Sequence, residues 1–474
     1  MAHSWRTLAK FRRVSYSADG HPMILIEHAV VISMDPARRI YGDGSVLIDG
    51  ERIVQVGRAA DVRPPRPPDR VIDGRGTLVL PGFIDTHAHL SEHLSRGLMP
   101  DEVPVDRYVP DWYVPLYGSI TPEEEAAAAQ LACLEMLRTG TTTFCEAGTL
   151  FDVPAVARAV DAVGLRAILG RWTWDLASGP GPLKQSTDEA LRRTETVLAE
   201  VNGKPGSRVT AWPLLIGFGT CSESLIRGAH ALAERQGTGW GMMQFASHPS
   251  RKTADTLPLA TLDAWGVLGP RTKLAHMVHV DFADIALLAR RDVKIAHCPS
   301  AALKHVKGLS AHGRFADMLD AGVCVSLGGD SANGSNHFDM LRLMYLAALV
   351  PKDARLDPGV MPPERVLEMA TIHGARALGL EHEIGSLEPG KRADLVVFDL
   401  DLPEWRPLLD PVNTLVYSAS AASVRTVLVD GRVVLEDRRV TTVDEGEVLA
   451  RVERLSAPYL ARAGLAPRPK WPML

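Results

Sequence analysis

Both ends of the chain alternate apolar and polar residues with a period of two, which is the pattern of β-strands that bury one face. Near the start, residues 45–56 predict two strands joined at an Asp-Gly pair, and near the finish residues 424–436 repeat this arrangement. An Asp-Gly pair between alternating apolar runs is a strong hairpin signal because the turn requires positive φ angles. With further strands at residues 24–32 and 393–400, the two ends predict one small β-sandwich assembled from both termini.

The middle of the chain alternates short apolar runs with segments of helical composition, such as residues 122–138 and 222–235. Strands that alternate with helices predict βα units around a parallel sheet. Eight units favour a closed (β/α)8 barrel, whose chemistry lies at the carboxyl ends of its strands, over an open doubly wound sheet. Helices over residues 338–349 and 363–378 are expected to follow. The eight predicted strands are residues 77–87, 141–146, 165–172, 208–217, 239–246, 272–279, 292–298 and 323–330.

These patterns predict an α/β protein with two structural parts. Residues 1–80 and 385–474 are expected to form the β-sandwich, the second segment with an added C-terminal helix. Residues 81–384 are expected to form the barrel. The 474 residues then make one barrel and one sandwich, although division by a typical domain size suggests roughly three domains.

Composition narrows the class of protein without naming a function. Hydrophobic residues make up 46% of the chain, which is enough for a large core and excludes disorder as its main character. The net charge of −5 offers no basic surface for nucleic acid. No run approaches the roughly 18 apolar residues that span a bilayer, and the N-terminus lacks the apolar core of a secretory or twin-arginine signal. We therefore expect a cytoplasmic protein that acts on a small molecule, without nucleic-acid or membrane partners. Its five cysteines are expected to be buried thiols.

The histidines carry the clearest chemical signal. His87 and His89 follow an apolar run and are separated by one residue, so in a strand both imidazoles point to the same face. Two nitrogen donors aimed at one point suit a divalent cation. His276 and Asp330 end two other predicted strands, whose carboxyl ends would meet at the same face of a barrel. Two more histidines close to predicted strand ends are His279 and His297.

Several motifs resemble those of a known family. Residues 80–90, LPGFIDTHAHL, are similar to the first barrel strand of the amidohydrolase superfamily. The resemblance covers nearly the whole chain and is closest to the branch of atrazine chlorohydrolase and the cytosine/adenosine-type deaminases. It implies a metal-bearing (β/α)8 barrel with a flanking β-sandwich, in agreement with the strand pattern. The later motifs, in order, are TGTTT at 139–143, LAHMVH at 274–279, HCP at 297–299, LGGD at 327–330, ARALG at 375–379 and GSLEPGKRADLVVFD at 385–399.

The resemblance implies metal-assisted hydrolysis with one divalent ion, zinc first, with iron, cobalt or manganese as alternatives. Such an ion lowers the pKa of a bound water, so that hydroxide forms near neutral pH. Asp330 would contact the ion, take the proton of the attacking water and pass it to the leaving group. His276 would be a ligand or a donor that polarises the electrophile. The predicted metal ligands are His87, His89, His276, Gln244 and Asp330, and the predicted catalytic residues are Asp330, His276 and His297.

The chain departs from the family at the fifth strand. The family has His-x-Ala-Glu there, with the histidine a metal ligand and the glutamate a proton shuttle, whereas this chain has Gln244 and Ser247 at those positions. An amide oxygen can bind a hard cation, but a serine cannot shuttle a proton as a carboxylate does. The following His248 either replaces one of these functions or faces solvent. Residues 216–222 also lack a histidine that deaminases of this branch use, and residues 299–302 lack the family's Ser-Asn pair.

These losses shape the expected substrate. Trp172, Trp174 and Phe218 predict a wide pocket for an apolar, N-substituted molecule, or else belong to the core. Glu92 falls where the chlorohydrolase carries a substrate-pocket glutamine, and a solvated loop acid is its alternative. The predicted substrate-binding residues are Glu92, Trp174, His279 and His248.

Three functional hypotheses follow. The first is hydrolysis of a C–N bond in an amide, urea or carbamate-like molecule, because the metal ligands remain while the deaminase shuttle is lost. The second is an aminohydrolase or chlorohydrolase acting on an s-triazine or related heterocycle. The third is a catalytically degraded homologue that binds without turnover. A homo-oligomer is also expected, with the helix over residues 338–349 as one candidate contact face.

Overall fold

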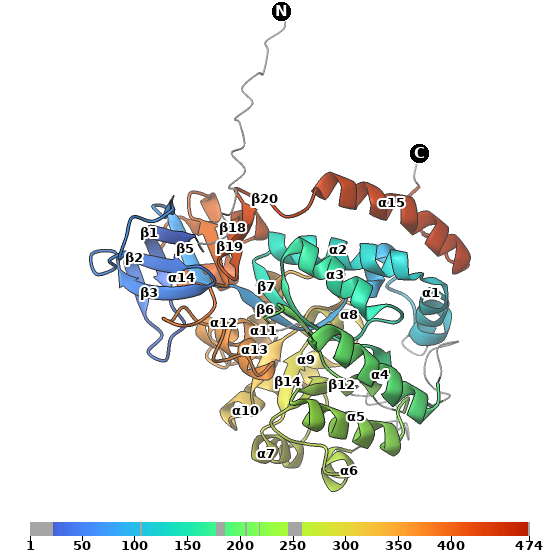
Figure 1. Cartoon of the computed structure of the whole chain (residues 1–474). Helices are drawn as coiled ribbons and strands as arrows, with labels where there is room; N and C mark the ends of the chain where they lie inside the picture. The colour runs from blue at the N-terminus through green and yellow to red at the C-terminus, as the bar shows by residue number, and fades with distance from the viewer. Residues whose placement is uncertain are drawn as a thin grey trace, which may run out of the picture.

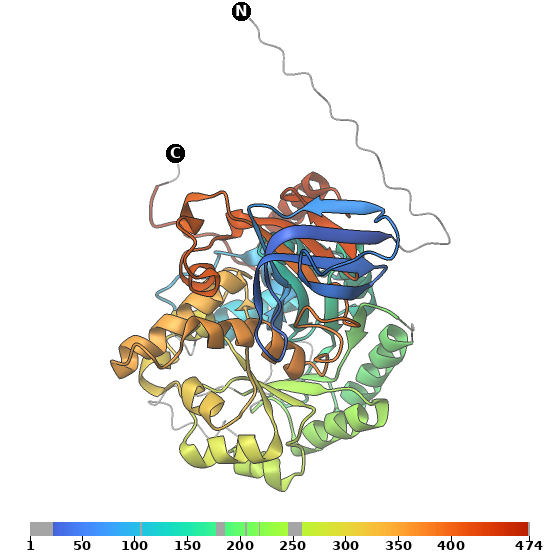
Figure 2. The same cartoon turned by 90° about the vertical axis from the view of Figure 1, so that its left-hand side faces the viewer.

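The computed structural model describes residues 22–104, 107–176, 185–203, 206–217, 219–244 and 258–472. The two ends of the chain build one sheet, which has nine strands in the order β20-β19-β18-β17-β5-β1-β2-β3, with β4 pairing on β1. Figure 2 shows strands from the two ends of the sequence side by side in this sandwich. Its strands are β1 (Met23–Ile32), β2 (Ile40–Asp49), β3 (Arg52–Arg58), β4 (Arg70–Asp73), β5 (Thr77–Pro81), β17 (Leu395–Asp399), β18 (Val424–Val429), β19 (Arg432–Glu436) and β20 (Arg439–Val440).

Both predicted hairpins are present. β2 pairs with β3 across a turn in which Gly50 has φ 60°, and β18 pairs with β19 across a turn in which Gly431 has φ 69°. These left-handed angles are the reason for glycine at each turn. The two ends join where β5 runs antiparallel to β17, with Pro81 opposite Leu395 and Thr77 opposite Asp399.

The middle of the chain forms the (β/α)8 barrel. Its parallel strands lie in two arcs, ordered β10-β8-β7-β6-β16 and β15-β14-β13-β12-β11-β9. Three of the eight predicted strands are each divided in two, as β8/β9, β10/β11 and β15/β16. One half of each pairs in the first arc and the other half in the second, so the two arcs join into one ring. The strands are β6 (Phe83–His89), β7 (Thr141–Glu146), β8 (Arg166–Leu169), β9 (Trp172–Thr173), β10 (Val209–Ala211), β11 (Leu214–Gly217), β12 (Trp240–Gln244), β13 (Thr272–His276), β14 (Lys294–His297), β15 (Val325–Leu327) and β16 (Asp330–Ser331).

One predicted strand was wrong in its extent. Residues 77–87 are not a single strand, because Thr77–Pro81 belongs to the sandwich as β5 and the barrel strand β6 begins at Phe83. Gly82 lies between them, and a Cβ atom there would lie 2.2 Å from the side chain of Thr142. Both strands are buried throughout, so burial alone does not separate them.

Helices surround the barrel, and α15 runs along α2 at its outer surface (Figure 1). The predicted helix over residues 363–378 is divided at Thr371, whose φ and ψ of −129° and −94° are not helical. The helices are α1 (Val114–Ser119), α2 (Pro122–Arg138), α3 (Val153–Val163), α4 (Thr187–Asn202), α5 (Glu223–Gln236), α6 (Leu259–Ala264), α7 (Phe282–Arg291), α8 (Pro299–Lys304), α9 (Leu309–His312), α10 (Phe315–Asp320), α11 (Met340–Arg355), α12 (Pro363–Ala370), α13 (Ile372–Ala377), α14 (Pro411–Tyr417) and α15 (Glu445–Arg462), with a 3-10 helix η1 (Leu90–Ser95) and a π-helix η3 (Val109–Tyr113).

Other expectations concern the molecule as a whole. The five cysteines are buried and form no disulfide, as predicted. Within the described residues, no helix is both long and apolar enough to cross a membrane. The part boundaries at residues 80 and 384, and oligomer formation through residues 338–349, stay predictions.

Candidate metal centre and substrate site

Four predicted ligands from three strands meet at the carboxyl-terminal face of the barrel. One ligand atom each of His87, His276 and Asp330 lies within 4.8 Å of the other two. His89, on the same strand as His87, places its Nε2 atom 3.4 Å from Asp330 Oδ1. All four residues are buried, so a group bound among them would be shielded from bulk water.

The backbone at this cluster is unusual. His276 has φ 75° and Asp330 has φ 65°, a left-handed conformation that costs roughly 1–3 kcal/mol for residues other than glycine. Each lies at a strand terminus, where the turned backbone aims the side chain away from the ordinary strand direction. Such strain is typical of functional sites, where the surrounding structure holds the residue in place.

Asp85 ties the two sides of the cluster together. Its Oδ1 accepts hydrogen bonds from the backbone N–H groups of His87, at 3.0 Å, and Gly329, at 3.1 Å. Burial raises the pKa of Asp85 to about 7. Gly328 is needed beside it, because a Cβ atom there would lie 2.7 Å from the Cβ of His87. Asp85 and this glycine therefore fix the distance between β6 and β16.

The electrostatics of the cluster suit a divalent cation. Burial lowers the pKa of His87 and of His276 well below the usual value and that of His89 to about 4, so the imidazoles are neutral donors. Although burial alone would raise it, His276 and Lys307 hold the pKa of Asp330 below its usual range. His87 Nε2 is buried and has no hydrogen-bond partner among the described residues. Neutral nitrogen donors together with one carboxylate are the ligands that Zn²⁺ prefers.

An aromatic wall stands beside the cluster. The ring of Trp172 lies edge-on to His89, with centroids 5.0 Å apart, and Tyr117 and Trp174 pack around it at 5.2 and 6.2 Å. Trp174, the predicted substrate residue, is 1% exposed and separated from His89 by this arrangement. Of the two predicted pocket tryptophans, Trp172 is therefore the one that contacts a metal ligand. The third predicted aromatic residue, Phe218, lies outside the described residues.

Glu92 is buried rather than solvated. It lies on η1, directly after β6, and its Oε1 accepts a hydrogen bond of 2.8 Å from the hydroxyl of Tyr117. Burial raises its pKa to about 7. Its other oxygen, Oε2, is buried without a hydrogen-bond partner of suitable geometry among the described residues. Glu92 thus offers an acceptor inside the site.

The structure does not bring His297 or His279 into the cluster. His297 stacks on Phe315, with ring centroids 3.6 Å apart. The ring of His279 packs against that of His312 with centroids 4.7 Å apart and planes tilted by 33°, and its Nε2 lies 2.8 Å from the carbonyl oxygen of Lys307. A catalytic role for His297 and substrate contact by His279 stay predictions.

The altered fifth strand is described only in part. The backbone of Gln244 pairs with His276 at the end of β12. Its side chain, together with Ser247 and His248, lies outside the described residues. Metal binding by Gln244 and substrate binding by His248 therefore stay predictions.

Sequence reasoning missed Lys307. This partly buried side chain interacts electrostatically with Asp330, His276 and His89, which come from three different strands. Its loop is turned by the adjacent Val306, which has φ 45° and is 62% exposed. No motif or spacing marks such a lysine, because only the turn of this loop brings its charge to the site.

Comparison with known protein families matches residues 78–434 to the amidohydrolase family. The 5-methylthioadenosine/S-adenosylhomocysteine deaminase of Pelotomaculum thermopropionicum is 35% identical over 440 residues, which cover 91% of this chain and 97% of that protein. The 5'-deoxyadenosine deaminase of Methanothermobacter thermautotrophicus is 37% identical over 447 residues, which cover 92% of this chain and 98% of that protein.

Solved structures give the same picture. An adenosine deaminase from Xanthomonas campestris with bound zinc has a TM-score of 0.85 and 27% identity, covering 92% of this chain and 98% of its own. An atrazine chlorohydrolase from Arthrobacter aurescens complexed with zinc has a TM-score of 0.82 and 26% identity, covering 91% of this chain and 100% of its own. These similarities confirm the resemblance drawn from the motifs and the barrel fold.

Proposed function

Because the chain belongs to the amidohydrolase family, and so is a hydrolase of C–N bonds other than peptide bonds, we propose that it removes an amino group from a heteroaromatic ring. The observation that carries this proposal is the buried cluster of His87, His276 and Asp330, whose ligand atoms lie within 4.8 Å of one another. With His89 beside them, they would hold one divalent ion, zinc by analogy with the solved relatives. This is the second of the three hypotheses, and the comparisons favour it over amide or urea hydrolysis.

The substrate class that we propose is a purine nucleoside altered at its 5′ position. The relatives named above are deaminases of adenosine-type molecules. A flat purine ring suits the aromatic wall of Trp172 and Tyr117. The carboxylate of Glu92 would accept hydrogen bonds from sugar hydroxyls, since a buried acceptor selects donors on its ligand.

The reaction needs a nucleophile, a proton acceptor and a proton donor. A divalent ion in the cluster would supply hydroxide near neutral pH by lowering the pKa of water. Because Ser247 cannot take the shuttle role of the family's glutamate, both proton steps would fall to Asp330. Held ionised, Asp330 would accept the proton from the attacking water at one carboxylate oxygen and return it to the leaving amino nitrogen. The buried surroundings exclude bulk water, which strengthens these interactions.

Assay of the purified full-length protein with Zn²⁺ tests the proposal. We expect ammonia from 5′-deoxyadenosine, methylthioadenosine or adenosine. If chloride or ammonia were released only from s-triazines, the substrate would be an s-triazine and not a purine nucleoside. Amine released only from amides or ureas would support the first hypothesis and contradict deamination.

A matched pair of variants ties the activity to the cluster. His87→Asn is expected to lower both the zinc content and the rate by at least a hundredfold. Mutating residues that only hydrogen-bond to a metal ligand already lowers metal affinity or activity by roughly 10–100-fold, and loss of the ligand itself should cost more. The same change at His28, which lies in the sandwich and pairs with Asp43, should alter neither. Unchanged zinc and activity in His87→Asn would contradict the metal assignment. A wild-type chain that binds nucleosides without any turnover would favour the degraded homologue.

A further inference from the structure

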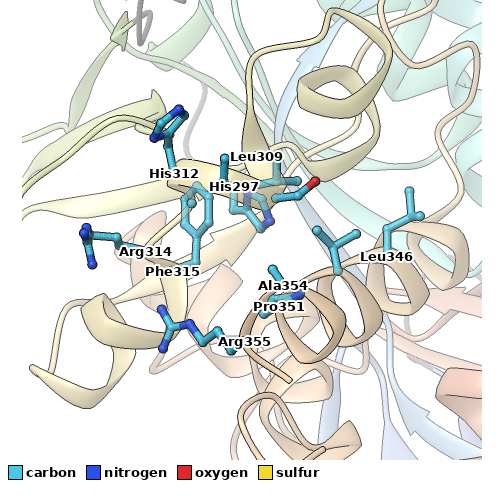
Figure 3. Close-up of a pocket in the computed structure, with 13 residues that line it drawn as sticks. His297, Leu309, His312, Arg314, Phe315, Leu346, Pro351, Ala354 and Arg355 are labelled. Carbon is cyan, nitrogen blue, oxygen red and sulfur yellow. The ribbon is translucent and has the colours of Figure 1, made fainter. Parts of the chain in front are cut away.

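A cavity apart from the metal cluster lies on the outer side of the barrel, between β14 and the helices α9, α10 and α11 (Figure 3). Its volume is about 130 Å³. The buried end is formed by His297, Leu309 and Phe315, and α11 contributes Leu346 and Val350. The more exposed residues at its opening are His312, Arg314, Ala354 and Arg355.

His297 lines this cavity because of its place in β14. Ala296 pairs with Ala275 of β13, and the next residue along the strand points to the opposite face. There the imidazole stacks on Phe315 at 3.6 Å, with 25° between the ring planes. The strand-end position therefore gives this histidine to the cavity, while His87 and His89 face the metal cluster.

The imidazole is polar and buried, and one of its two nitrogens, Nδ1, lacks a hydrogen-bond partner among the described residues. His297 is 3% exposed. Burial lowers its pKa to about 3, so the ring stays neutral at physiological pH. Leaving a buried polar atom without a partner is unfavourable, and such atoms are uncommon in folded proteins. A hydroxyl group can satisfy Nδ1 in either tautomer, because it both donates and accepts.

The opening carries an excess of positive charge. Arg355 donates two hydrogen bonds to Asp317, one to Oδ1 at 3.2 Å and one to Oδ2 at 2.5 Å, and Arg314 Nη1 lies 3.8 Å from Asp317 Oδ2. Two guanidinium groups share this one carboxylate. An anionic group at the opening would balance the charge, and guanidinium groups bind carboxylates with two parallel hydrogen bonds.

We propose that this cavity is a binding site for a small hydroxylated aromatic carboxylic acid. Its size approaches the roughly 150 Å³ of an apolar cavity that holds benzene. The ring would lie between Phe315 and the α11 side chains, the hydroxyl would meet His297, and the carboxylate would meet Arg314 and Arg355. The site is independent of the metal cluster, although the His297 carbonyl accepts a 2.9 Å hydrogen bond from Gly328 N–H, two residues before Asp330.

Calorimetric titration of the zinc-loaded full-length protein tests this site with 4-hydroxybenzoate as the probe. We expect one bound molecule per chain. Benzoate lacks the hydroxyl and 4-hydroxybenzyl alcohol lacks the carboxylate, and each should bind about tenfold more weakly, the loss of one good polar contact. Equal affinity for all three compounds would overturn the proposed polar contacts.

Variants locate the binding. Leu346→Trp fills the cavity and should weaken 4-hydroxybenzoate binding at least tenfold, while Leu356→Trp, at an 89% exposed position beyond the same helix, should leave it unchanged. Arg355→Met should weaken binding of 4-hydroxybenzoate but not of 4-hydroxybenzyl alcohol. A misfolded protein would lose affinity for both compounds. Binding that survives Leu346→Trp and disappears when the metal is removed would place the acid at the metal cluster and overturn the proposal. Absence of any binding at millimolar probe would do the same.

Discussion

Glu92 combines burial, a tyrosine partner and a pKa of about 7, against an ordinary value of 4.5. If its carboxylate accepts substrate hydroxyls, only the ionised form binds well. We therefore expect kcat/KM to rise with pH through about 7. Glu92→Gln should remove this rise and lower kcat/KM by roughly ten- to a hundredfold, the value of about 1.5–3 kcal/mol for a hydrogen bond to a charged group. Steady-state kinetics over a pH series measures both effects.

Tyr117→Phe provides the companion measurement. The Tyr117 hydroxyl stabilises the ionised form of Glu92, so its removal should move the rising limb to higher pH without abolishing it. If the rise of kcat/KM with pH kept its midpoint in both Glu92→Gln and Tyr117→Phe, the titrating group would be one other than Glu92.

Glu146 makes a different prediction, about stability. This fully buried carboxyl accepts a hydrogen bond from Thr149, and its other oxygen has no partner among the described residues. Burial raises its pKa well above 4.5, so the folded chain binds this proton more tightly than the unfolded chain does. The stabilisation is complete below pH 4.5 and declines as pH rises above it, by up to about 1.4 kcal/mol per pH unit.

Glu146→Gln should remove this decline, because an amide does not ionise in this range. The difference in urea midpoint between wild type and variant should therefore change steadily in favour of the variant as pH rises. Glu234→Gln, at an exposed position of α5, is the matched control. Parallel pH profiles for wild type and Glu146→Gln would contradict the argument.

At the scale of elements, the alternating patterns predicted the hairpins and the eight barrel units because each depends on local chemistry. Two features depend on tertiary contacts instead. Residues 77–87 are buried throughout, and only pairing with β17 or β7 assigns Thr77–Pro81 to the sandwich and Phe83–His89 to the barrel. Whether His297 points into or out of the barrel depends on which alternate residues of β14 face inward. That register is set by pairing with β13 and cannot be derived from the sequence alone.

The site shows the same division. His87 and His89 could be paired from their spacing, because a strand places alternate residues on one face. His276 and Asp330 could be placed at the same face of the barrel as strand ends, but their left-handed backbone, which sets where the side chains point, does not follow from strand spacing. Lys307 could not be found at all, because a turned loop brings it to the ligands.

The C-terminal helix α15 supports the loop that carries Glu92. Ser456 Oγ donates a 2.7 Å hydrogen bond to the Leu94 carbonyl in η1, and Tyr459 Oη donates one of 3.3 Å to the Leu116 carbonyl. Tyr459 is 1% exposed, so Tyr459→Ala should lower the free energy of unfolding by about 3 kcal/mol. We also expect KM to rise more than kcat falls, since α1, which carries the Glu92 partner Tyr117, loses a support.

Denaturation and steady-state kinetics measure the two effects of Tyr459→Ala. Leu449→Ala, at a 48% exposed position of the same helix, should change neither by much. Loss of stability with unaltered KM would separate α15 from the substrate site.

At the scale of the whole molecule, one ion cluster joins barrel to sandwich. Arg166, at the start of β8, donates hydrogen bonds to Asp394 at 2.9 and 3.2 Å and also pairs with Asp430. All three side chains are at most 10% exposed. Arg166→Ala leaves two buried carboxylates with less compensation and should cost about 3–5 kcal/mol of stability.

Urea unfolding followed by tryptophan fluorescence measures this cost. Arg193→Ala breaks an exposed pair with Glu189 and should cost less than about 1 kcal/mol. Similar losses in the two variants would show that the junction contributes no more than a surface ion pair.

The pairing of β5 with β17 also means that β5 is synthesised long before its partner strand. Leu395 follows Pro81 by 314 residues, so the ribosome needs roughly 15–60 s to supply the missing partner at 5–20 residues per second. During that interval the β5 edge, with its buried apolar residues, has no neighbour on this side, and open strand edges invite pairing with other chains. A nascent chain of this protein should therefore depend on chaperones most strongly while its barrel is being made, and a message truncated before β17 should yield aggregates.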